Sequence, residues 1–325
     1  MIVTQTPLRI SFFGGGTDFS DYYRQVGGSV LTTAIDKYVY VIVKRRFDDA
    51  IYINYSSKEI VGSVDEIRHD LVRESMRITG VKKGVEITTL ADVPSSGTGL
   101  GSSSAVTVGL LHALHTYQDR LVDAPTLAEE ACHIEIDTLD RPIGKQDQYI
   151  AAHGGIQTIQ FQPDDQVCVE RMIAPPTVLL RLQQSLLLFF TGRTRSSTDI
   201  LQHQQAHIRR NRTELDQLKA CAHEAQHLLA NGQLDEFGNL LDTAWAHKKL
   251  LAKGISDSVI DELYTQARTA GALGGKLSGA GGGGFLLLYV PLSKQDAVRA
   301  ALHPLRELPV AFEPSGSKVV LNIHD

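Results

Sequence analysis

The chain has 325 residues, of which 42% are hydrophobic and 21% are charged, as in folded globular proteins rather than disordered ones. Thirty-two Lys and Arg against 37 Asp and Glu give a formal net charge of −5, which argues against a general nucleic-acid binder. The longest apolar runs, such as 186–190 and 285–290, are far shorter than the roughly 20 residues of a membrane helix. The first nine residues lack the basic start and apolar core of a signal peptide.

The cysteines point to a reducing compartment. Cys132, Cys168 and Cys221 are odd in number, widely spaced and without a CxxC pair, which argues against a disulfide framework and a structural zinc site. We therefore expect a cytoplasmic protein with no membrane partner. The sequence is compatible with a monomer or a homodimer.

The first half of the chain alternates between strand and helix signals. Runs of β-branched and aromatic residues predict strands, and apolar residues at helical spacing predict helices. The expected strands are 37–43, 51–55, 85–90 and 154–161, and the expected helices are 64–79, 104–117 and 126–139.

A boundary is expected after Ala174, because the pair Pro175-Pro176 stops regular structure. It divides the chain into domains 1–174 and 175–325. Both halves mix strands and helices, which predicts a two-domain α+β or α/β protein. Beyond the boundary we expect strands at 185–190, 285–290 and 318–323, and helices at 197–230, 233–252, 257–270 and 294–305.

Half of the 28 glycines lie in three short spans, 14–16, 97–101 and 271–284. Glycine concentrates where the backbone adopts positive φ or approaches a ligand closely. The clusters therefore predict binding loops built from backbone.

The second cluster, PSSGTGLGSSSA at 94–105, follows a strand and opens a helix. Several backbone N–H groups and the helix start can then face one anion, and serine oxygens can complete a phosphate shell or bind Mg²⁺. A flexible linker would not need these flanks. The segment is not a Walker A loop, since no GxxxxGK[ST] occurs, and the GxGxxG at 279–284 precedes a strand instead of opening a helix.

Three motifs together resemble those of the GHMP kinases (galactokinase, homoserine kinase, mevalonate kinase, phosphomevalonate kinase). They are PLRISFFGGGTD at 7–18, the segment 94–105, and KLSGAGGGGF at 276–285, in the family's order. The resemblance implies an α+β two-domain fold. Residues 1–174 would form a domain like ribosomal protein S5 domain 2 carrying the phosphate-binding loop, and 175–325 a ferredoxin-like C-terminal domain. It also implies ATP as co-substrate and Mg²⁺ as cofactor.

The resemblance also assigns catalytic and metal-binding roles. Asp147 would orient the sugar hydroxyl and accept its proton, and Arg9 would stabilise charge on the transferred phosphoryl group. Ser103 and Glu135 would bind the metal, with Ser102 or Ser104 as near substitutes; a solvated helix carboxylate is the alternative for Glu135. The expected nucleotide-binding residues are Pro94, Gly97, Gly99, Leu100, Gly101, Ser102, Ser103 and Ser104.

The sugar side is expected around Asp18, whose turn resembles the hydroxyl-binding part of the sugar kinases. A carboxylate can accept two hydroxyl hydrogen bonds, although an Asx turn is another explanation. The expected substrate-binding residues are Gly15, Gly16, Thr17, Asp18, Lys145, Arg193, Arg195 and Gly281.

A second anion site is suggested by FFTGRTRSST at 189–198, which reads as a strand, a turn and a helix start. Arg193 and Arg195 beside a helix N-terminus suit a phosphate, although they could equally be solvated loop residues. Since the nucleotide phosphates already have a binding loop, we infer that the substrate carries a phosphate of its own.

Within the family, the amino-acid sequences of 7–19 and of 144–155 (GKQDQYIAAHGG) are most similar to those of D-glycero-D-manno-heptose 7-phosphate kinases. The resemblance implies phosphorylation of the anomeric hydroxyl of a sugar that already bears a phosphate, giving a 1,7-bisphosphate for nucleotide-heptose biosynthesis. Another GHMP sugar 1-kinase, fucokinase-like or galactokinase-like, is the alternative.

Two other classes of function compete with a kinase. His223, Glu224 and His227 form an HExxH pattern, as in zinc hydrolases. The apolar face of their predicted helix directs both histidines toward solvent, so a zinc hydrolase is the distant alternative. A non-catalytic binding protein would lose the acidic residues, but Asp147 and Glu135 are both present.

Overall fold

The computed structural model describes residues 1–94, 97–194 and 197–323, so the predicted site residue Arg195 lies outside the described residues. A large mixed sheet runs in the order β12-β1-β2-β5-β3-β4, and β6 joins it through β2 and pairs in turn with β7. Most neighbours are antiparallel, while β3 and β5 are parallel. The strands are β1 (Ile2–Phe13), β2 (Gly28–Arg45), β3 (Ile51–Asn54), β4 (Lys58–Val61), β5 (Val85–Ala91), β6 (Ile156–Phe161), β7 (Val167–Arg171) and β12 (Lys318–Asn322).

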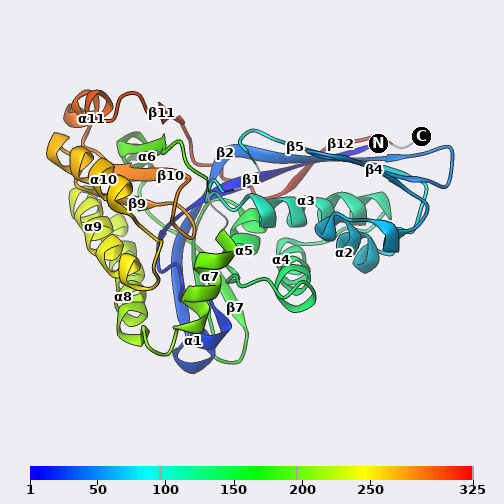
Figure 1. Cartoon of the computed structure of the whole chain (residues 1–325), viewed down its shortest axis with the longest axis horizontal. Helices are drawn as coiled ribbons and strands as arrows, with labels where there is room; N and C mark the ends of the chain where they lie inside the picture. The colour runs from blue at the N-terminus through cyan, green and yellow to red at the C-terminus, as the bar shows by residue number, and fades with distance from the viewer. Residues whose placement is uncertain (95–96, 195–196, 324–325) are drawn as a thin grey trace.

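Helices α2, α3 and α4 cover one face of this sheet (Figure 1). Helix α3 packs on β1 and β2 and forms the centre of the layer. It can do so because most of its own residues are small or apolar and are buried. The helices of this lobe are α1 (Ser20–Val26), α2 (Asp70–Thr79), α3 (Ser102–Tyr117), α4 (Ala124–Cys132) and α5 (Gln146–His153), with a 3₁₀ turn at Val64–Glu66 and a π-helical turn at His133–Thr138.

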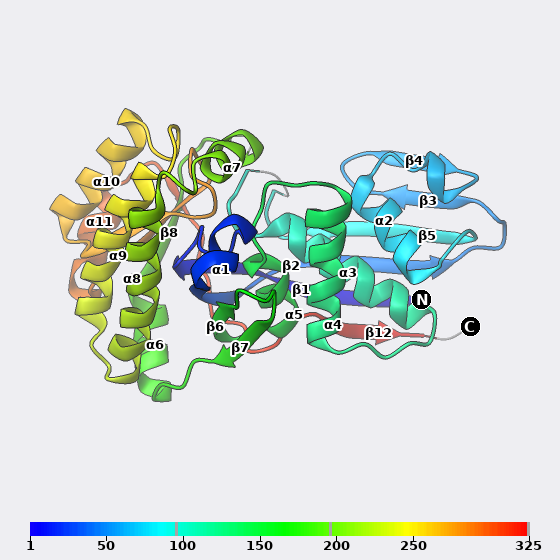
Figure 2. The same ribbon diagram turned by 90° about the horizontal axis from the view of Figure 1, so that it is seen from below.

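The second lobe is built on a smaller sheet in the order β11-β8-β10-β9. Its central strands read LLLFF and FLLLY, and such continuous apolar runs are typical of strands buried on both faces. Helices α8 and α9 lie side by side in both views (Figure 2). The elements are α6 (Pro176–Ser185), β8 (Leu186–Phe190), α7 (Ser197–Ala206), α8 (Arg212–Ala230), α9 (Leu234–Leu250), α10 (Ser258–Ala270), β9 (Gly274–Leu277), β10 (Phe285–Tyr289), a 3₁₀ turn Leu292–Lys294, α11 (Gln295–Ala301) and β11 (Arg306–Glu307).

Strands β1 and β2 extend from the first lobe to the helices of the second (Figure 1). At the end of β1, the rings of Phe12 and Phe13 meet Phe237 of α9 edge-on, with ring centroids 5.6 and 5.0 Å apart. Such edge-to-face contacts add to the burial of large apolar side chains. The residues just after Phe13 are therefore held between the two lobes.

The mixed α+β architecture confirms the predicted fold class, with differences in individual elements. Residues 172–175 are irregular, as the pair Pro175-Pro176 predicted, and Pro176 is also the first residue of α6, a position where its missing N–H costs nothing. The predicted helix 197–230 is two helices, α7 and α8. The division into 1–174 and 175–325 stays a prediction, and the last strand, β12, pairs with β1 of the first sheet.

Candidate active site

Two adjoining cavities lie between the lobes and share Arg9 and Asp147 on their common wall. The small cavity has a volume of about 80 Å³, and the large cavity about 870 Å³. The small cavity is lined by Arg9, Ser11, Gly15, Gly16, Asp18, Phe19, Ile143, Gly144, Gln146, Asp147, Leu201, Lys248, Lys276, Gly279 and Ala280. The predicted residues that line the large cavity are Arg9, Gly97, Gly99, Gly101, Ser102, Ser103, Ser104, Asp147 and Gly281.

Arg9 and Asp147 form a two-pronged ion pair at this junction. Nε and Nη2 of Arg9 donate to the two carboxylate oxygens of Asp147 at 2.6 and 2.7 Å. The guanidinium also donates to the carbonyl of Gly99 at 2.5 Å, and the Arg9 backbone N–H donates to Leu100 O at 3.0 Å. These bonds join β1, the second glycine cluster and the start of α5. The side chain of Asp147 is 22% exposed, which leaves it accessible from the cavities.

Asp18 lies at the wall of the small cavity and is buried. Its carboxylate accepts hydrogen bonds from the backbone N–H of Gly16 at 2.9 Å and from Nε2 of Gln146 at 3.1 Å. Burial raises the pKa of this carboxyl, and the nearby charge of Asp147 raises it further. Two other atoms of the cavity-lining residues, Ser11 Oγ and Gln146 Oε1, are buried without a hydrogen-bond partner among the described residues. The cavity therefore offers hydrogen-bonding groups suited to a polyhydroxyl ligand.

Two buried lysines complete the small cavity. Lys276 of β9 donates to the carbonyls of Ser11 and Phe12 at 2.8 and 3.2 Å, which ties the second lobe to β1. Lys248 of α9 donates to Gln204 Oε1 at 3.0 Å and approaches Gly15 O at 3.4 Å. Burial lowers the pKa of Lys248 to about 8. Burial and the nearby charge of Lys248 lower the pKa of Lys276 to about 7.

The second glycine cluster forms one wall of the large cavity. Helix α3 begins at Ser102, so its first N–H groups face the cavity side of the loop. Gly99 has φ of +74°, and a Cβ there would lie 2.2 Å from the carbonyl oxygen of Ser278. The adjoining Phe285 N–H donates to Thr98 O at 3.3 Å. The third glycine cluster thus packs backbone against backbone on the second, as only residues without side chains permit.

Glu135 is fully buried beneath the loop and faces three donors. It accepts hydrogen bonds from Ser103 Oγ at 2.7 Å, from Gln148 Nε2 at 2.7 Å and from Arg141 Nη1 at 3.2 Å. Burial raises the pKa of its carboxyl, and the bond from Ser103 opposes that shift. Carboxylate and hydroxyl oxygens are the ligands that Mg²⁺ prefers, and in this structure the Arg141 guanidinium contacts the same two oxygens.

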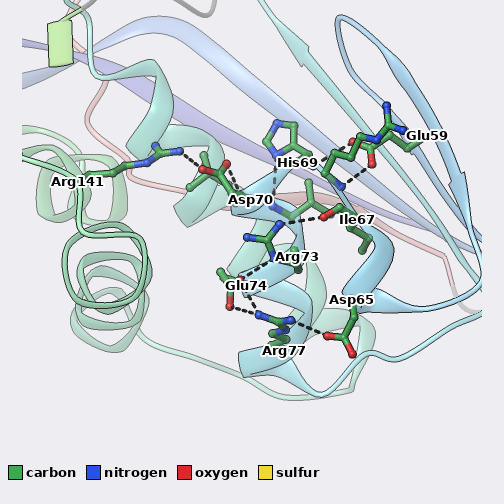
Figure 3. Close-up of polar contacts among 12 residues, drawn as sticks. Glu59, Asp65, Ile67, His69, Asp70, Arg73, Glu74, Arg77 and Arg141 are labelled. Atoms are coloured by element: carbon green, nitrogen blue, oxygen red, sulfur yellow. Dashed lines mark hydrogen bonds and ion pairs between the residues drawn. The ribbon is translucent and has the colours of Figure 1, made fainter. Parts of the chain in front are cut away.

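Arg141 extends this group to α2. Its Nη1 donates to Ser103 Oγ at 2.6 Å, and its Nη2 donates to Asp70 Oδ2 at 2.9 Å. Figure 3 shows Arg141 reaching Asp70 at the start of α2, while a separate group of ion pairs on the same helix joins Arg73, Glu74 and Arg77. Burial is the largest single influence on the pKa of Asp70 and acts to raise it. The hydrogen bond and the charge of Arg141, together with the backbone N–H of Leu71, outweigh burial and hold this pKa below its usual range. Arg141 is thus held between Asp70 and the Ser103–Glu135 pair.

Several predicted site residues lie away from both cavities, and their roles stay predictions. The hydroxyl of Thr17 donates to Gly14 O and Ser29 O, and Lys145 lies 3.8 Å from Asp165. Nη1 of Arg193 donates to Asp257 at 2.7 Å. Pro94 is exposed and Leu100 is buried.

The HExxH residues lie on α8, where His223, Glu224 and His227 are exposed, as the apolar spacing predicted. Across the described ranges, no group of three or more His, Cys, Asp or Glu is placed to hold a metal ion. The described helices also include none that is long and apolar enough to cross a membrane.

Sequence reasoning missed Lys248, Gln204, Gln146 and Arg141. Lys248 had a readable signal, because it falls on the same stripe of α9 as Leu241, Ala244 and Trp245, all of them buried. A lysine at a core-facing position is rare unless the ammonium has partners. The others carry no signal in the sequence, since their neighbours come from distant elements.

Two family models match the chain: the GHMP kinases N-terminal domain over residues 64–155 and the GHMP kinases C-terminal model over residues 225–305. A D-glycero-alpha-D-manno-heptose 7-phosphate kinase of Campylobacter jejuni is 30% identical over 314 residues, or 92% of each chain. An L-fucokinase/L-fucose-1-P guanylyltransferase of Bacteroides fragilis is 26% identical over 91% of this chain and 35% of its own length. The crystal structure of a D-glycero-D-manno-heptose 1-phosphate kinase from Bacteroides thetaiotaomicron superposes with a TM-score of 0.82, 26% identity and 100% coverage of both chains.

Proposed function

This chain belongs to the GHMP kinases, and we propose that it transfers the γ-phosphoryl group of ATP to the anomeric hydroxyl of D-glycero-D-manno-heptose 7-phosphate. One observation carries the proposal. The Arg9–Asp147 pair lies where a small cavity rich in hydrogen-bonding groups adjoins a large cavity. One wall of the large cavity is the second glycine cluster, called the glycine loop below. That arrangement suits a sugar on one side and a nucleotide on the other.

In the proposed reaction, Asp147 orients the attacking hydroxyl and accepts its proton at a carboxylate oxygen. Arg9 holds that carboxylate by two hydrogen bonds and keeps a positive charge beside the transferred group. The hydroxyl oxygen forms the new bond to the γ-phosphorus as the bond to the ADP oxygen breaks. Asp18 and Gln146 orient the remaining hydroxyls of the sugar.

The glycine loop supplies the nucleotide phosphates with backbone N–H donors and the start of α3. Ser103 and Glu135 are the residues that would hold Mg²⁺. When bound, Mg²⁺ would neutralise charge on the phosphates. Phosphoryl transfer depends mainly on such positioning and charge neutralisation, and the chain supplies each part.

The substrate assignment rests on the similarity to the heptose 7-phosphate kinase, and the fucokinase similarity makes a neutral sugar the second candidate. The test is a panel of sugars and sugar 7-phosphates with ATP and Mg²⁺, in which ³¹P NMR locates the new phosphate. We expect the highest kcat/KM on the heptose 7-phosphate, with the product phosphate on C1. Preferred turnover of L-fucose or galactose would replace the heptose assignment, and transfer to none of the sugars would overturn the proposed function.

A further inference from the structure

Lys248 and Gln204 form a buried pair of hydrogen-bond donors beside the small cavity, from helices α9 and α7 of the second lobe. An ammonium has three N–H donors, and Lys248 directs two of them to Gln204 Oε1 and Gly15 O. Gln204 is 1% exposed, and its Nε2 has no hydrogen-bond partner among the described residues. The third N–H of Lys248, which lines the small cavity, is therefore available to a ligand, while the carbonyl of the Gln204 amide holds the ammonium in place.

Lys248 also lacks a carboxylate within ion-pair distance among the described residues, although the charge of Asp18 acts on it from farther away. Within the described ranges neither Lys248 nor Lys276 forms an ion pair, although both are buried. The carboxylate of Asp147, which also lines the small cavity, is already paired with Arg9. A buried ammonium without an anion is costly, and an anionic group brought by the substrate would offset that cost.

The glycines at 15 and 16 connect this pair to the cavity. Both line the small cavity, as does Lys248. A Cβ at Gly16 would lie 2.5 Å from Gln204 Nε2, so a side chain there would displace the amide. The bare backbone at this turn therefore leaves room for the Gln204 amide, which accepts a hydrogen bond from Lys248 at the cavity wall.

We propose that Lys248, assisted by Gln204, binds the phosphate that the sugar substrate already carries. The inference rests on the proposed function, because it requires a sugar in the small cavity with its reacting hydroxyl at Asp147. A phosphate group is anionic and offers only acceptors, which matches the positive charge and the remaining N–H of Lys248. Of the two arginines that the sequence suggested for this phosphate, Arg193 pairs with Asp257, and Arg195 lies outside the described residues. Lys248 thus selects the phosphorylated sugar over the free one.

The test compares Lys248→Met with Lys249→Met on D-glycero-D-manno-heptose 7-phosphate and on the unphosphorylated heptose. Lys249 is the matched control, because it is the next residue on α9 and pairs with Asp261 at 3.2 Å on the partly exposed face. We expect Lys248→Met to lower kcat/KM on the 7-phosphate by about 10- to 100-fold, mostly through KM, and on the free heptose by less than about threefold. The KM for ATP and both activities of Lys249→Met should stay near wild type.

Each other outcome has a definite meaning. An equal loss on both sugars, or no loss, overturns the role of Lys248 in phosphate recognition. If Lys248→Met does not fold, Gln204→Leu replaces it, with a smaller fall of about fivefold expected on the 7-phosphate alone. A wild type that phosphorylates sugars without preferring the 7-phosphate overturns this inference and the 7-phosphate assignment but leaves a sugar kinase, whereas one that phosphorylates no sugar overturns the proposed function as a whole.

Discussion

The two cavities that meet at Arg9 and Asp147 are built in different ways. One wall of the large cavity is a single stretch of chain, 97–104, and its main groups are backbone N–H donors and serine hydroxyls. The small cavity takes its side chains from β1, α5, α7, α9 and β9. Backbone donors suit any nucleotide phosphate, whereas side chains from many elements can be replaced one at a time. The difference places general chemistry on the nucleotide side and specificity on the sugar side.

Substitution of Asp147, at the junction of the two cavities, should have the largest effect, and it should lower turnover without changing nucleotide binding. Asp147→Asn removes the proton acceptor and leaves the glycine loop unchanged, so we expect kcat to fall by about 10²- to 10⁴-fold. Nucleotide affinity, measured by calorimetry with an unreactive ATP analogue, should change by less than about threefold. Turnover near the wild-type rate in Asp147→Asn would show that the junction is not where transfer occurs.

On the proposed nucleotide side, replacing a glycine of the loop should weaken ATP binding, because it changes the backbone contact between the two glycine clusters. In Gly99→Ala the residue keeps φ of +74°, and its Cβ meets Ser278 O at 2.2 Å, so the contact between the two glycine clusters must open. We expect the KM for ATP to rise about tenfold and the free energy of unfolding to fall by about 1–3 kcal/mol.

The control for Gly99 is Gly80→Ala. Gly80 has φ of +76° at the end of α2, and nothing lies within 4 Å of a Cβ there. It should lose about 1 kcal/mol of stability and keep its KM for ATP. A KM for ATP that rises equally in both variants would mean that general strain, and not the contact with Ser278, causes the effect.

What could be predicted from the sequence follows the same division. The glycine loop could be predicted from the sequence because its residues are adjacent and its proposed function needs only backbone geometry between a strand and a helix. Gln204 and Arg141 were not readable, because the positions of α7 and of the turn after Thr138 depend on packing between distant elements. The paired prolines marked the break at 172–175 but not the helix α6 that begins at Pro176, since a proline can begin a helix as well as end one. Lys248 lies between these cases, with a local signal but no local partner.

Raising the pH should weaken the sugar side alone. The pKa of Lys248 is lowered to about 8 mainly by burial, with Asp18 opposing the shift and Arg9 adding to it, while Lys276 also faces the ammonium. Below pH 8 Lys248 is mostly charged, and above it the charge is lost, so the KM for the 7-phosphate should rise about tenfold from pH 7 to pH 9. The KM for ATP should rise less, and the KM for the 7-phosphate in Lys248→Met should lack this rise. A wild-type KM for the 7-phosphate that is flat over this range would contradict a charged Lys248 at the substrate.

The smallest effect is expected where a side chain intrudes on the nucleotide side. Arg141 donates to Ser103 and contacts Glu135, so its guanidinium occupies oxygens that a divalent cation would use. Arg141→Ala should therefore tighten Mn²⁺ binding to the nucleotide-bound protein by about threefold, measured by electron paramagnetic resonance, because competition for the two oxygens is removed. Arg77→Ala is the control, since it breaks ion pairs of the same kind, with Asp65 and Glu74, without touching either oxygen. If Arg141→Ala weakens Mn²⁺ binding instead, Arg141 supports the cation site through its bonds to Ser103 and Asp70. The nucleotide side would then depend on a distant side chain as the sugar side does.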